Sequence, residues 1–342
     1  MITGAAGYIG SHTIVELVQA GYDIVGVDNF CASSPAVLDG IADIIGRKID
    51  FVEADCTDYN AFETVFKKYD DIVAAVHFAA YKVVNESFGT PLEYYDNNLR
   101  SLINLVRLMK ERAMLANIVF SSSAAVYGQV PEEALPILET TPLQPATSPY
   151  GRTKLICEEI LQDSVKAYDN LHVTSLRYFN PIGAHPSAKI GEYSHGVPQN
   201  IVPYITQTAA GMRECLNVFG NDYNTPDGSC IRDFIYVVDL AKAHVKAIER
   251  MLASSIKWDV FNIGTGSGVS VLELVKAFMS ATGIKLNYKI ADRREGDIVV
   301  SYANADKACR ELGWRADTPL EEILLSAWKW QQQLQKHTGK QM

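Results

Sequence analysis

The chain has 342 residues, of which 48% are hydrophobic and 21% charged, and its net charge is −9 at pH 7. This composition is typical of a globular protein with a sizeable core, and the acidic charge argues against nucleic acid or an anionic membrane as the main partner. No apolar run approaches the roughly 20 residues of a membrane helix. The six scattered cysteines include no CxxC pair and the seven histidines no HExxH spacing, so we expect a cytoplasmic protein without a metal site.

The first stretch predicts a nucleotide-binding turn between a strand and a helix. Its sequence is MITGAAGYIGSHTIVELVQAG, in which Gly4, Gly7 and Gly10 fall every third residue. Such glycines allow a tight turn, a close approach of the backbone to a pyrophosphate, and close packing of the helix on the sheet. A second strand ends on Asp28, about where a carboxylate accepts hydrogen bonds from an adenosine ribose. A glycine triplet alone is a weak signal, but this combination predicts a dinucleotide site.

The end of the second strand also favours one cofactor over another. The Asp28 carboxylate would repel the extra phosphate of NADP, and no Lys or Arg lies between it and Arg47 to offset the repulsion. We therefore predict NAD. The first strand has little room before Gly4, since strands usually span about five residues. Either this strand is unusually short or the chain as given begins a few residues late.

Strands and helices then alternate along the chain, which predicts right-handed crossovers and an α/β fold with a doubly wound parallel sheet. From about residue 184 the alternation breaks up, which indicates a smaller mixed α/β lobe facing the substrate. We assign residues 1–183 and 231–265 to the nucleotide-binding domain, and 184–230 and 266–342 mainly to the smaller lobe. The expected strands are 49–55, 71–80, 117–128 and 172–183, and the expected helices are 59–69, 91–112, 150–168 and 319–334.

Tyr150 and Lys154 are candidates for acid–base chemistry. They are four residues apart at the start of a predicted helix, so their side chains share one face. The preceding strand ends in Ser121, Ser122 and Ser123, at the edge of the sheet where ligands bind. A phenol with a pKa of about 10 is a poor base at neutral pH, but a nearby ammonium lowers that pKa, and a serine can orient the hydroxyl being deprotonated. The alternative is an exposed pair without function.

These residues occur together with further phrases that identify a family. The chain contains HFAAYKVVNES (77–87), PLEYYDNN (91–98), SSSAAVYG (121–128), YGRTK (150–154), LRYFNPIGAHPS (176–187), FGNDYNTPDG (219–228), IRDFIYVVDLA (231–241) and RREGD (293–297). In this combination it resembles the extended short-chain dehydrogenase/reductases over essentially its whole length. The resemblance implies a Rossmann domain with tightly bound NAD and an isomerase that interconverts UDP-galactose and UDP-glucose at C4 through a transient 4-keto sugar.

The resemblance also implies roles for individual residues. Tyr150 would be the base, with Ser123 as its hydrogen-bonding companion and Lys154 on the nicotinamide ribose. The NAD site would consist of Gly4, Gly7, Tyr8, Ile9, Gly10, Asp28, Asn29, Ser33, Asp55, Cys56, Phe78, Ala79, Ala80, Lys82, Asn97, Ser121, Tyr150, Lys154 and Tyr178. The UDP-hexose would contact Lys82, Ser123, Tyr150, Asn180, Asn200, Ile201, Phe219, Arg232, Arg294, Asp297 and Ser301.

The helices at 91–112 and 150–168 resemble those that pair into a homodimer interface in the family. The apolar face of the first helix would be supplied by Leu99, Leu102, Ile103 and Val106. The same side chains could instead pack on the sheet.

Two features bear on substrate choice. Dehydratase relatives carry an Asp–Glu pair after the active-site serine or threonine, whereas Ala124 and Ala125 follow Ser123 here, which argues against elimination of water. Counted from RREGD, the position that limits sugar size in the family falls on Ser301, and a small residue there is typical of members that also accept N-acetylated UDP-hexoses. A shift by one residue to Tyr302 would reverse this inference.

Two alternative functions remain open from the sequence. One is another nucleotide-sugar enzyme on the same scaffold, such as a UDP-uronic acid epimerase or a decarboxylase. The other is a non-enzymatic regulator that senses NAD, which would have no need of Tyr150, Lys154 and Ser123.

Overall fold

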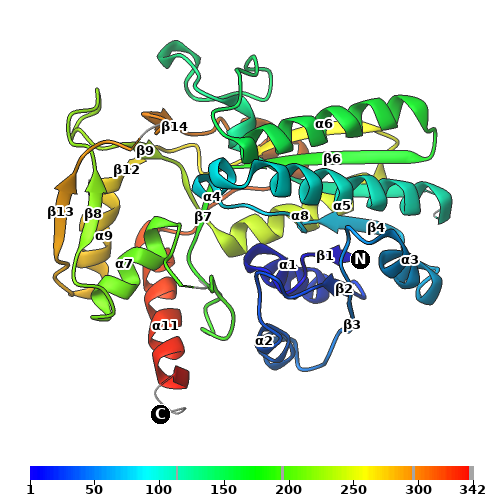
Figure 1. Ribbon diagram of the computed structural model, residues 1–342, viewed down its shortest axis with the longest axis horizontal. Coiled ribbons are helices and arrows are strands. Elements are labelled where there is room, and N and C mark those ends of the chain that lie inside the picture. Colours follow the sequence, from blue (N-terminus) through cyan, green and yellow to red (C-terminus); the bar gives the residue numbers. More distant parts are fainter. Residues whose placement is uncertain (113–114, 194–195, 295–296, 339–342) are drawn as a thin grey trace.

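A seven-stranded parallel sheet forms the centre of the structure, a computed structural model that describes residues 1–112, 115–193, 196–294 and 297–338 (Figure 1). Its strands are β1 (Ile2–Thr3), β2 (Val25–Asp28), β3 (Asp50–Glu53), β4 (Ala74–His77), β5 (Ala116–Ser123), β6 (Leu171–Tyr178) and β11 (Trp258–Ile263). Their order is β3-β2-β1-β4-β5-β6-β11, and every neighbouring pair is parallel. The order reverses between β1 and β4, which confirms the predicted doubly wound sheet.

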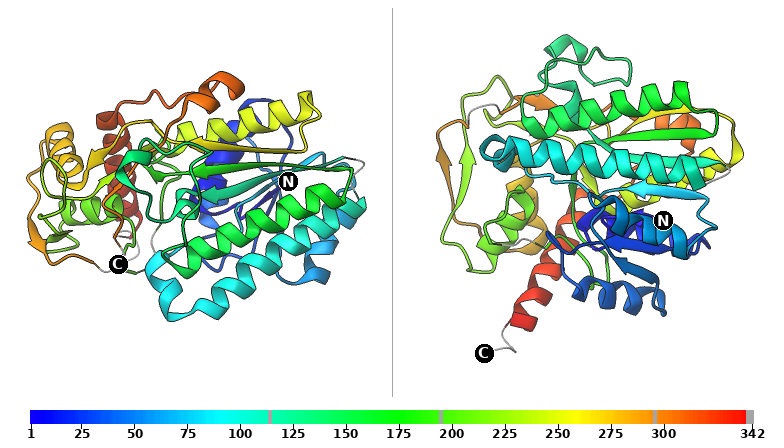
Figure 2. Two further views of the ribbon diagram at one scale, coloured as in Figure 1. Left: turned by 90° about the horizontal axis from the view of Figure 1, so that it is seen from above. Right: turned by 45° about the vertical axis from the view of Figure 1, so that its right-hand side comes forward.

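Helices cover both faces of this sheet (Figure 1 and Figure 2). One face carries α1 (Tyr8–Gln19), α2 (Ala36–Ile45) and α8 (Val237–Ala253), which share an apolar core with the strands. The opposite face carries α3 (Tyr59–Lys68), α5 (Pro91–Arg112) and α6 (Pro149–Ala167) over a second core, and the short helix α4 (Val84–Gly89) packs against α6. Burial on both faces explains why the central strands are apolar runs without alternation.

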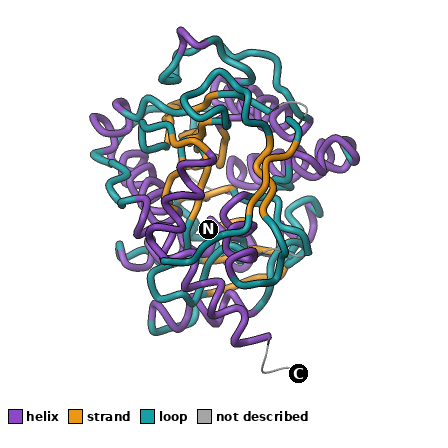
Figure 3. The backbone as a smooth tube through the Cα atoms, turned by 90° about the vertical axis from the view of Figure 1, so that its left-hand side faces the viewer, coloured by secondary structure: helices purple, strands orange, loops and turns teal. Residues whose placement is uncertain are grey.

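Shorter strands and three helices build the smaller lobe, which faces the viewer in Figure 3. Its strand pairs are β7 (Asn180–Ile182) with β10 (Phe234–Tyr236), and β8 (Leu216–Phe219) with β13 (Tyr288–Ala291). A third sheet joins β9 (Ile231–Arg232) to β12 (Val269–Ser270) and β14 (Val300–Ser301). The helices α7 (Ile201–Ala209), α9 (Val271–Thr282) and α11 (Leu320–Thr338) enclose a core of their own with these strands. The exact domain limits stay a prediction.

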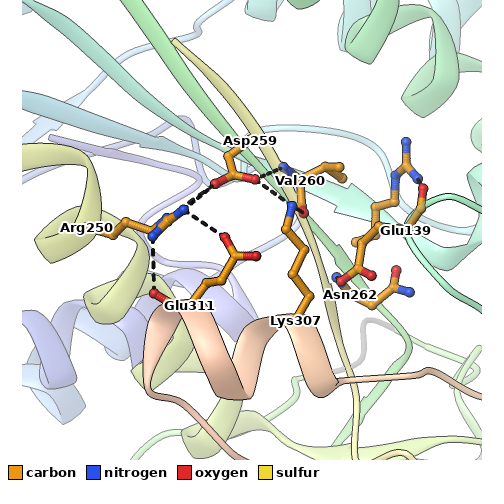
Figure 4. Close-up of polar contacts among 8 residues, drawn as sticks. Glu139, Arg250, Asp259, Val260, Asn262, Lys307 and Glu311 are labelled. Carbon is orange, nitrogen blue, oxygen red and sulfur yellow. Dashed lines mark hydrogen bonds and ion pairs between the residues drawn. The ribbon is translucent and has the colours of Figure 1, made fainter. Parts of the chain in front are cut away.

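Ion pairs fasten the edge strand β11 to two helices. In Figure 4, Arg250 of α8 and Lys307 of α10 (Asp306–Leu312) converge on the Asp259 carboxylate, with N–O distances of 3.0 and 2.6 Å. Arg250 also pairs with Glu311 at 2.8 Å. All four side chains are at least partly shielded from water, so these contacts are screened less by salt than fully exposed pairs.

The four expected strands all end earlier than predicted, and for two of them a specific contact explains the end. The stretch 172–183 splits at Phe179. The N–H of Phe179 donates to the carbonyl oxygen of Ile263 in β11, whereas the N–H of Asn180 donates to the carbonyl oxygen of Asp233 beside β10. The chain thus leaves the main sheet for the smaller lobe at the carboxyl end of β6. The stretch 117–128 ends at Ser123, whose hydroxyl accepts from the N–H of Ala125 and starts a 3-10 turn at Ala124–Tyr127.

Other elements differ only in length or were not expected. The strand expected at 71–80 is limited to β4, and the last helix runs on to Thr338. The helix α2 was not predicted, although Gly46 ends it in a left-handed conformation. Among the described residues, none of the helices combines the length and the apolar character needed to cross a bilayer.

Candidate active site

The glycine turn brings α1 unusually close to the end of β1. Gly4 has a φ of +67°, and a Cβ on it would lie 2.8 Å from the amide nitrogen of Ala79. A Cβ on Gly10 would lie 2.2 Å from the carbonyl oxygen of Gly4. Only glycine fits at these two positions, and their compact geometry aims the N-terminus of α1 at a site that suits a pyrophosphate.

Asp28 lies beside this turn at the end of β2, with its carboxylate fixed by three donors. The N–H groups of Ala6 and Phe30 donate to it at 2.9 and 2.8 Å, and the Ser33 hydroxyl donates at 3.0 Å. The side chain of the neighbouring residue, Asn29, donates to Asp55 at 3.1 Å. The structure therefore places Asp28 where an adenosine ribose is expected in this fold.

The other predicted cofactor residues gather along the same edge of the sheet. Tyr8, Ile9 and Gly10 start α1, and Asn97 lies on α5. The rest lie at or just beyond the carboxyl ends of β3 to β6, where doubly wound sheets bind ligands; they are Asp55, Cys56, Phe78, Ala79, Ala80, Lys82, Ser121 and Tyr178.

Tyr150 and Lys154 lie in the first turns of α6. Ser148 caps this helix by accepting from the N–H of Gly151 at 3.1 Å, and Pro149 occupies its first position. The Lys154 ammonium donates to the carbonyl oxygen of Ser121 at 2.7 Å, which holds the side chain against the end of β5. Ser123 lies close enough to the Tyr150 hydroxyl to act against the rise in its pKa. The predicted triad is thus assembled between α6 and β5.

Burial dominates the titration of this triad. It raises the pKa of Tyr150 despite the opposing effect of Ser123, so the expected lowering by an ammonium does not prevail in the protein alone. Burial also lowers the pKa of Lys154 to about 8, against smaller opposing effects of Cys157 and Glu158. A lysine with this pKa is still mostly protonated at pH 7.

A cavity of about 310 Å³ lies in the smaller lobe, and Ser123, Tyr150 and Lys154 are not part of its wall. Its wall includes Asn180, which lies two residues beyond Tyr178 at the carboxyl end of β6. Seven of the residues predicted to contact the UDP-hexose line this cavity: Asn180, Asn200, Ile201, Phe219, Arg232, Arg294 and Asp297.

Positive charge and an aromatic ring meet in this cavity. The Arg294 guanidinium lies 4.7 Å from the centre of the Phe219 ring and donates to both oxygens of Asp297 at 3.1 Å. Arg232 approaches Asp297 to 4.0 Å. Two guanidinium groups suit the binding of a diphosphate, and the Phe219 ring, which has polar groups around it, suits the stacking of a planar base.

Ser301 and Lys82 are not among the residues that line this cavity. Ser301 is buried in β14, in register with Arg232 of β9, so it is not a solvent-facing serine. Lys82 pairs with Glu192 at 3.2 Å, and Glu192 also accepts from Asn200 at 2.5 Å. Of the RREGD phrase, residues 295 and 296 lie outside the described residues.

Sequence reasoning missed several residues of the site. Glu192 contacts both Lys82, which follows β4, and Asn200, at the N-terminus of α7. No local sequence pattern distinguishes Glu192 from other acidic residues. The cavity wall also includes Asn85, Tyr204, Asn217 and Cys230, which come from four separate segments. Only the fold brings them together.

A second cavity, of about 420 Å³, lies between α7 and α11. Several polar side chains in its wall already have partners: Gln331 contacts Thr206 and Met212, and Gln207 accepts from Arg213. Within the described residues, no group of three His, Cys, Asp or Glu side chains is arranged to hold a metal ion.

Comparisons with known proteins agree with this geometry. A sequence model of the family described as GDP-mannose 4,6 dehydratase matches residues 1–326. The UDP-glucose 4-epimerase of Bacillus subtilis is 51% identical over 331 residues, which cover 97% of this chain and 96% of that protein. The human UDP-glucose 4-epimerase is 46% identical over 339 residues, with 97% and 96% covered.

Solved structures extend the likeness to three dimensions. The UDP-glucose 4-epimerase of Stenotrophomonas maltophila, with bound NAD and formylated UDP-arabinopyranose, superposes with a TM-score of 0.94 at 45% identity and covers 98% of both chains. The enzyme of Bifidobacterium longum, in complex with NAD+ and UDP, gives a TM-score of 0.92 at 44% identity and 97% coverage of both chains.

The burial of Lys154 predicts a pH-dependent cost in stability. Because its folded-state pKa of about 8 lies below the usual lysine value of 10.5, the unfolded protein binds more protons between these values, and folding becomes more favourable as the pH rises. In the cofactor-free protein we expect Lys154→Met to be the more stable form at neutral pH, with an advantage that shrinks by roughly 3 kcal/mol across this window. Urea unfolding at several pH values measures the difference. Lys166→Met, an exposed position on the same helix, should show no such trend; a constant advantage for Lys154→Met would contradict the prediction.

Proposed function

The chain belongs to the GDP-mannose 4,6 dehydratase family, and we propose that within it the chain is an NAD-dependent enzyme that reversibly interconverts UDP-galactose and UDP-glucose at C4. The observation that carries this proposal is the cavity lined by Arg232 and Arg294, in which seven of the residues expected to contact the UDP-hexose meet. The cavity suits a nucleoside diphosphate, and the triad suits proton transfer at a sugar hydroxyl. Ala124 and Ala125 replace the acidic pair of dehydratases, which leaves epimerisation as the better match.

The residues present fit NAD. The glycine turn leaves no room for a Cβ at Gly4 or Gly10, and Asp28 is held ready beside it to accept from a ribose. NAD held there would supply a reversible hydride acceptor for C4 of the sugar, so the overall reaction would involve no net oxidation.

The protein's own groups would supply binding and proton transfer. Arg232 and Arg294 would hold the diphosphate, with Asp297 giving up part of its contact with them, and Phe219 would stack on the uracil. Tyr150 would remove the proton from the 4-hydroxyl while Ser123 orients that group. The Lys154 ammonium would stabilise the phenolate, offsetting the burial that raises the pKa of Tyr150.

The direct test is to incubate the purified protein with UDP-galactose and no added NAD. We expect UDP-glucose to form, because a cofactor that is regenerated in every turnover stays bound through purification. Tyr150→Phe should reduce the rate at least 100-fold, the usual scale of a lost general base. Tyr168→Phe, at the other end of α6, is the matched control and should retain activity. Absence of UDP-glucose even with NAD supplied would refute the proposed reaction, and full activity of Tyr150→Phe would refute the role of the tyrosine.

We further propose that the enzyme accepts UDP-N-acetylglucosamine and UDP-N-acetylgalactosamine. Ser301 is a small buried residue in β14, in register with Arg232, which lines the cavity. We expect Ser301→Tyr to lose activity on the N-acetylated sugars and to keep activity on UDP-galactose, because the added ring takes up the space beside the sugar. Product analysis with both substrates measures this, and Tyr302→Ser tests the neighbouring position. Retained N-acetyl activity in Ser301→Tyr would rule out the gate.

We infer that the protein is a cytoplasmic homodimer that pairs through α5 and α6. Leu102 and Val106 are buried in the core under the sheet, but half-exposed apolar side chains remain on the two helices, namely Tyr95, Ile103, Ile156 and Ile160. The two helices run side by side on one face of the molecule (Figure 2). We expect sedimentation equilibrium to give twice the mass of one chain, and Ile160→Lys to give a single chain. A single chain in the unaltered protein would contradict the dimer.

A further inference from the structure

Resting on the proposed function, we propose that Glu158 is a positioning residue, which fixes the serine-bearing end of β5 against the helix that carries Tyr150 and Lys154. Glu158 lies on α6, one turn beyond Lys154, and only 1% of it is exposed. Both of its carboxylate oxygens are occupied by protein donors, so it acts through its neighbours.

The Glu158 carboxylate is saturated with donors from two strands. One oxygen, Oε1, accepts from the hydroxyls of Ser122 and Ser175 at 2.6 and 2.8 Å and from Nε of Arg177 at 2.9 Å. The other, Oε2, accepts from Nη2 of Arg177 at 2.5 Å. A buried carboxylate with a bidentate arginine and two hydroxyls has little freedom to move, because losing any one contact leaves a buried polar group unpaired.

Ser122 connects this cluster to the reacting groups. The carbonyl oxygen of its neighbour Ser121 accepts from the Lys154 ammonium at 2.7 Å, and its other neighbour, Ser123, lies close enough to the Tyr150 hydroxyl to affect its pKa. Three consecutive serines therefore each contact α6, and the middle contact goes to Glu158. The hydrogen bond between Ser122 and Glu158 sets the distance between the end of β5 and α6. It thereby also sets the contacts of Ser121 with Lys154 and of Ser123 with Tyr150.

Arg177 extends the clamp to the turn that follows Ser123. Its Nη1 donates to the Tyr127 hydroxyl at 3.0 Å, and its guanidinium lies 4.9 Å from the centre of that ring. The Tyr127 hydroxyl in turn donates to Asn262 of β11 at 2.6 Å. The chain is thus held on both sides of Ser123, by Ser122 before it and by Tyr127 after it, through a single ion pair.

Two serines on the same carboxylate oxygen provide a matched test. Ser122 and Ser175 are both buried and donate to Oε1 at similar distances, but only Ser122 adjoins residues that contact Tyr150 and Lys154. We expect Ser122→Ala to lower kcat for UDP-galactose roughly tenfold with KM changed less than about twofold, the size of effect expected from a small misplacement of reacting groups. Ser175→Ala should keep kcat within about twofold, although both variants lose a similar amount of thermal stability, since each loses one buried hydrogen bond.

The outcomes separate this inference from the proposed function. If the unaltered enzyme forms no UDP-glucose, the proposed function fails, whatever the variants do. If it is active and both variants lose kcat equally, or neither does, Glu158 contributes only to stability and the inference is wrong. If Ser122→Ala gives no folded protein, Ser122→Cys replaces it with the same expected result, because a thiol fills the space but donates only weakly. Ser122→Thr keeps the hydroxyl and should retain kcat.

Discussion

A buried carboxylate must be fully hydrogen-bonded, and three such carboxylates hold the parts of this structure together. Asp28, Glu158 and Asp233 are 8%, 1% and 0% exposed. Each carboxylate accepts hydrogen bonds from donors on different segments. Burying such a carboxylate without partners would cost folding free energy, but with these donors it joins elements that apolar packing alone would allow to slide past each other. Asp28 ties the second strand to the glycine turn, and Glu158 ties α6 to β5 and β6.

Asp233 performs the corresponding task for the smaller lobe. It lies between β9 and β10 and accepts from Thr265 and Gly266, just beyond β11 of the main sheet, and from Ala303, just beyond β14. These contacts fix Arg232 and Ser301, the neighbours of Asp233 and Ala303, relative to the carboxyl ends of the parallel strands. Burial raises the pKa of Asp233, and the hydrogen bonds oppose that shift. The cavity wall that contains Arg232 is therefore placed by the same kind of contact that ties α6 to the main sheet.

The range of each interaction along the chain determines what the sequence could predict. The glycine turn with Asp28 and the pair Tyr150 and Lys154 are local patterns, and from them the doubly wound sheet and the place of the triad follow directly. The resemblance to a family added the cavity residues, which lie on separate segments. Glu158, Glu192 and Asp233 gather partners from distant parts of the chain, and nothing in their local sequence distinguishes them from surface acids. The point at which the chain leaves the main sheet, Phe179, was also not predictable from local sequence. It depends on which distant strand pairs with the chain on either side of this residue.

Hydrogen bonds and an ion pair fasten the segment after β7 to the cofactor side of the molecule. A segment fastened in this way suits a reaction without net oxidation. The Tyr8 hydroxyl, in the first turn of α1, donates to the carbonyl oxygen of Gly183 at 2.6 Å. A few residues on, Glu192 pairs with Lys82 and accepts from Asn200. These contacts link the glycine turn and the end of β4 to the rim of the substrate cavity. An enzyme that must exchange its cofactor in every turnover needs a route past this segment, whereas one that regenerates NAD on the sugar can keep it fastened.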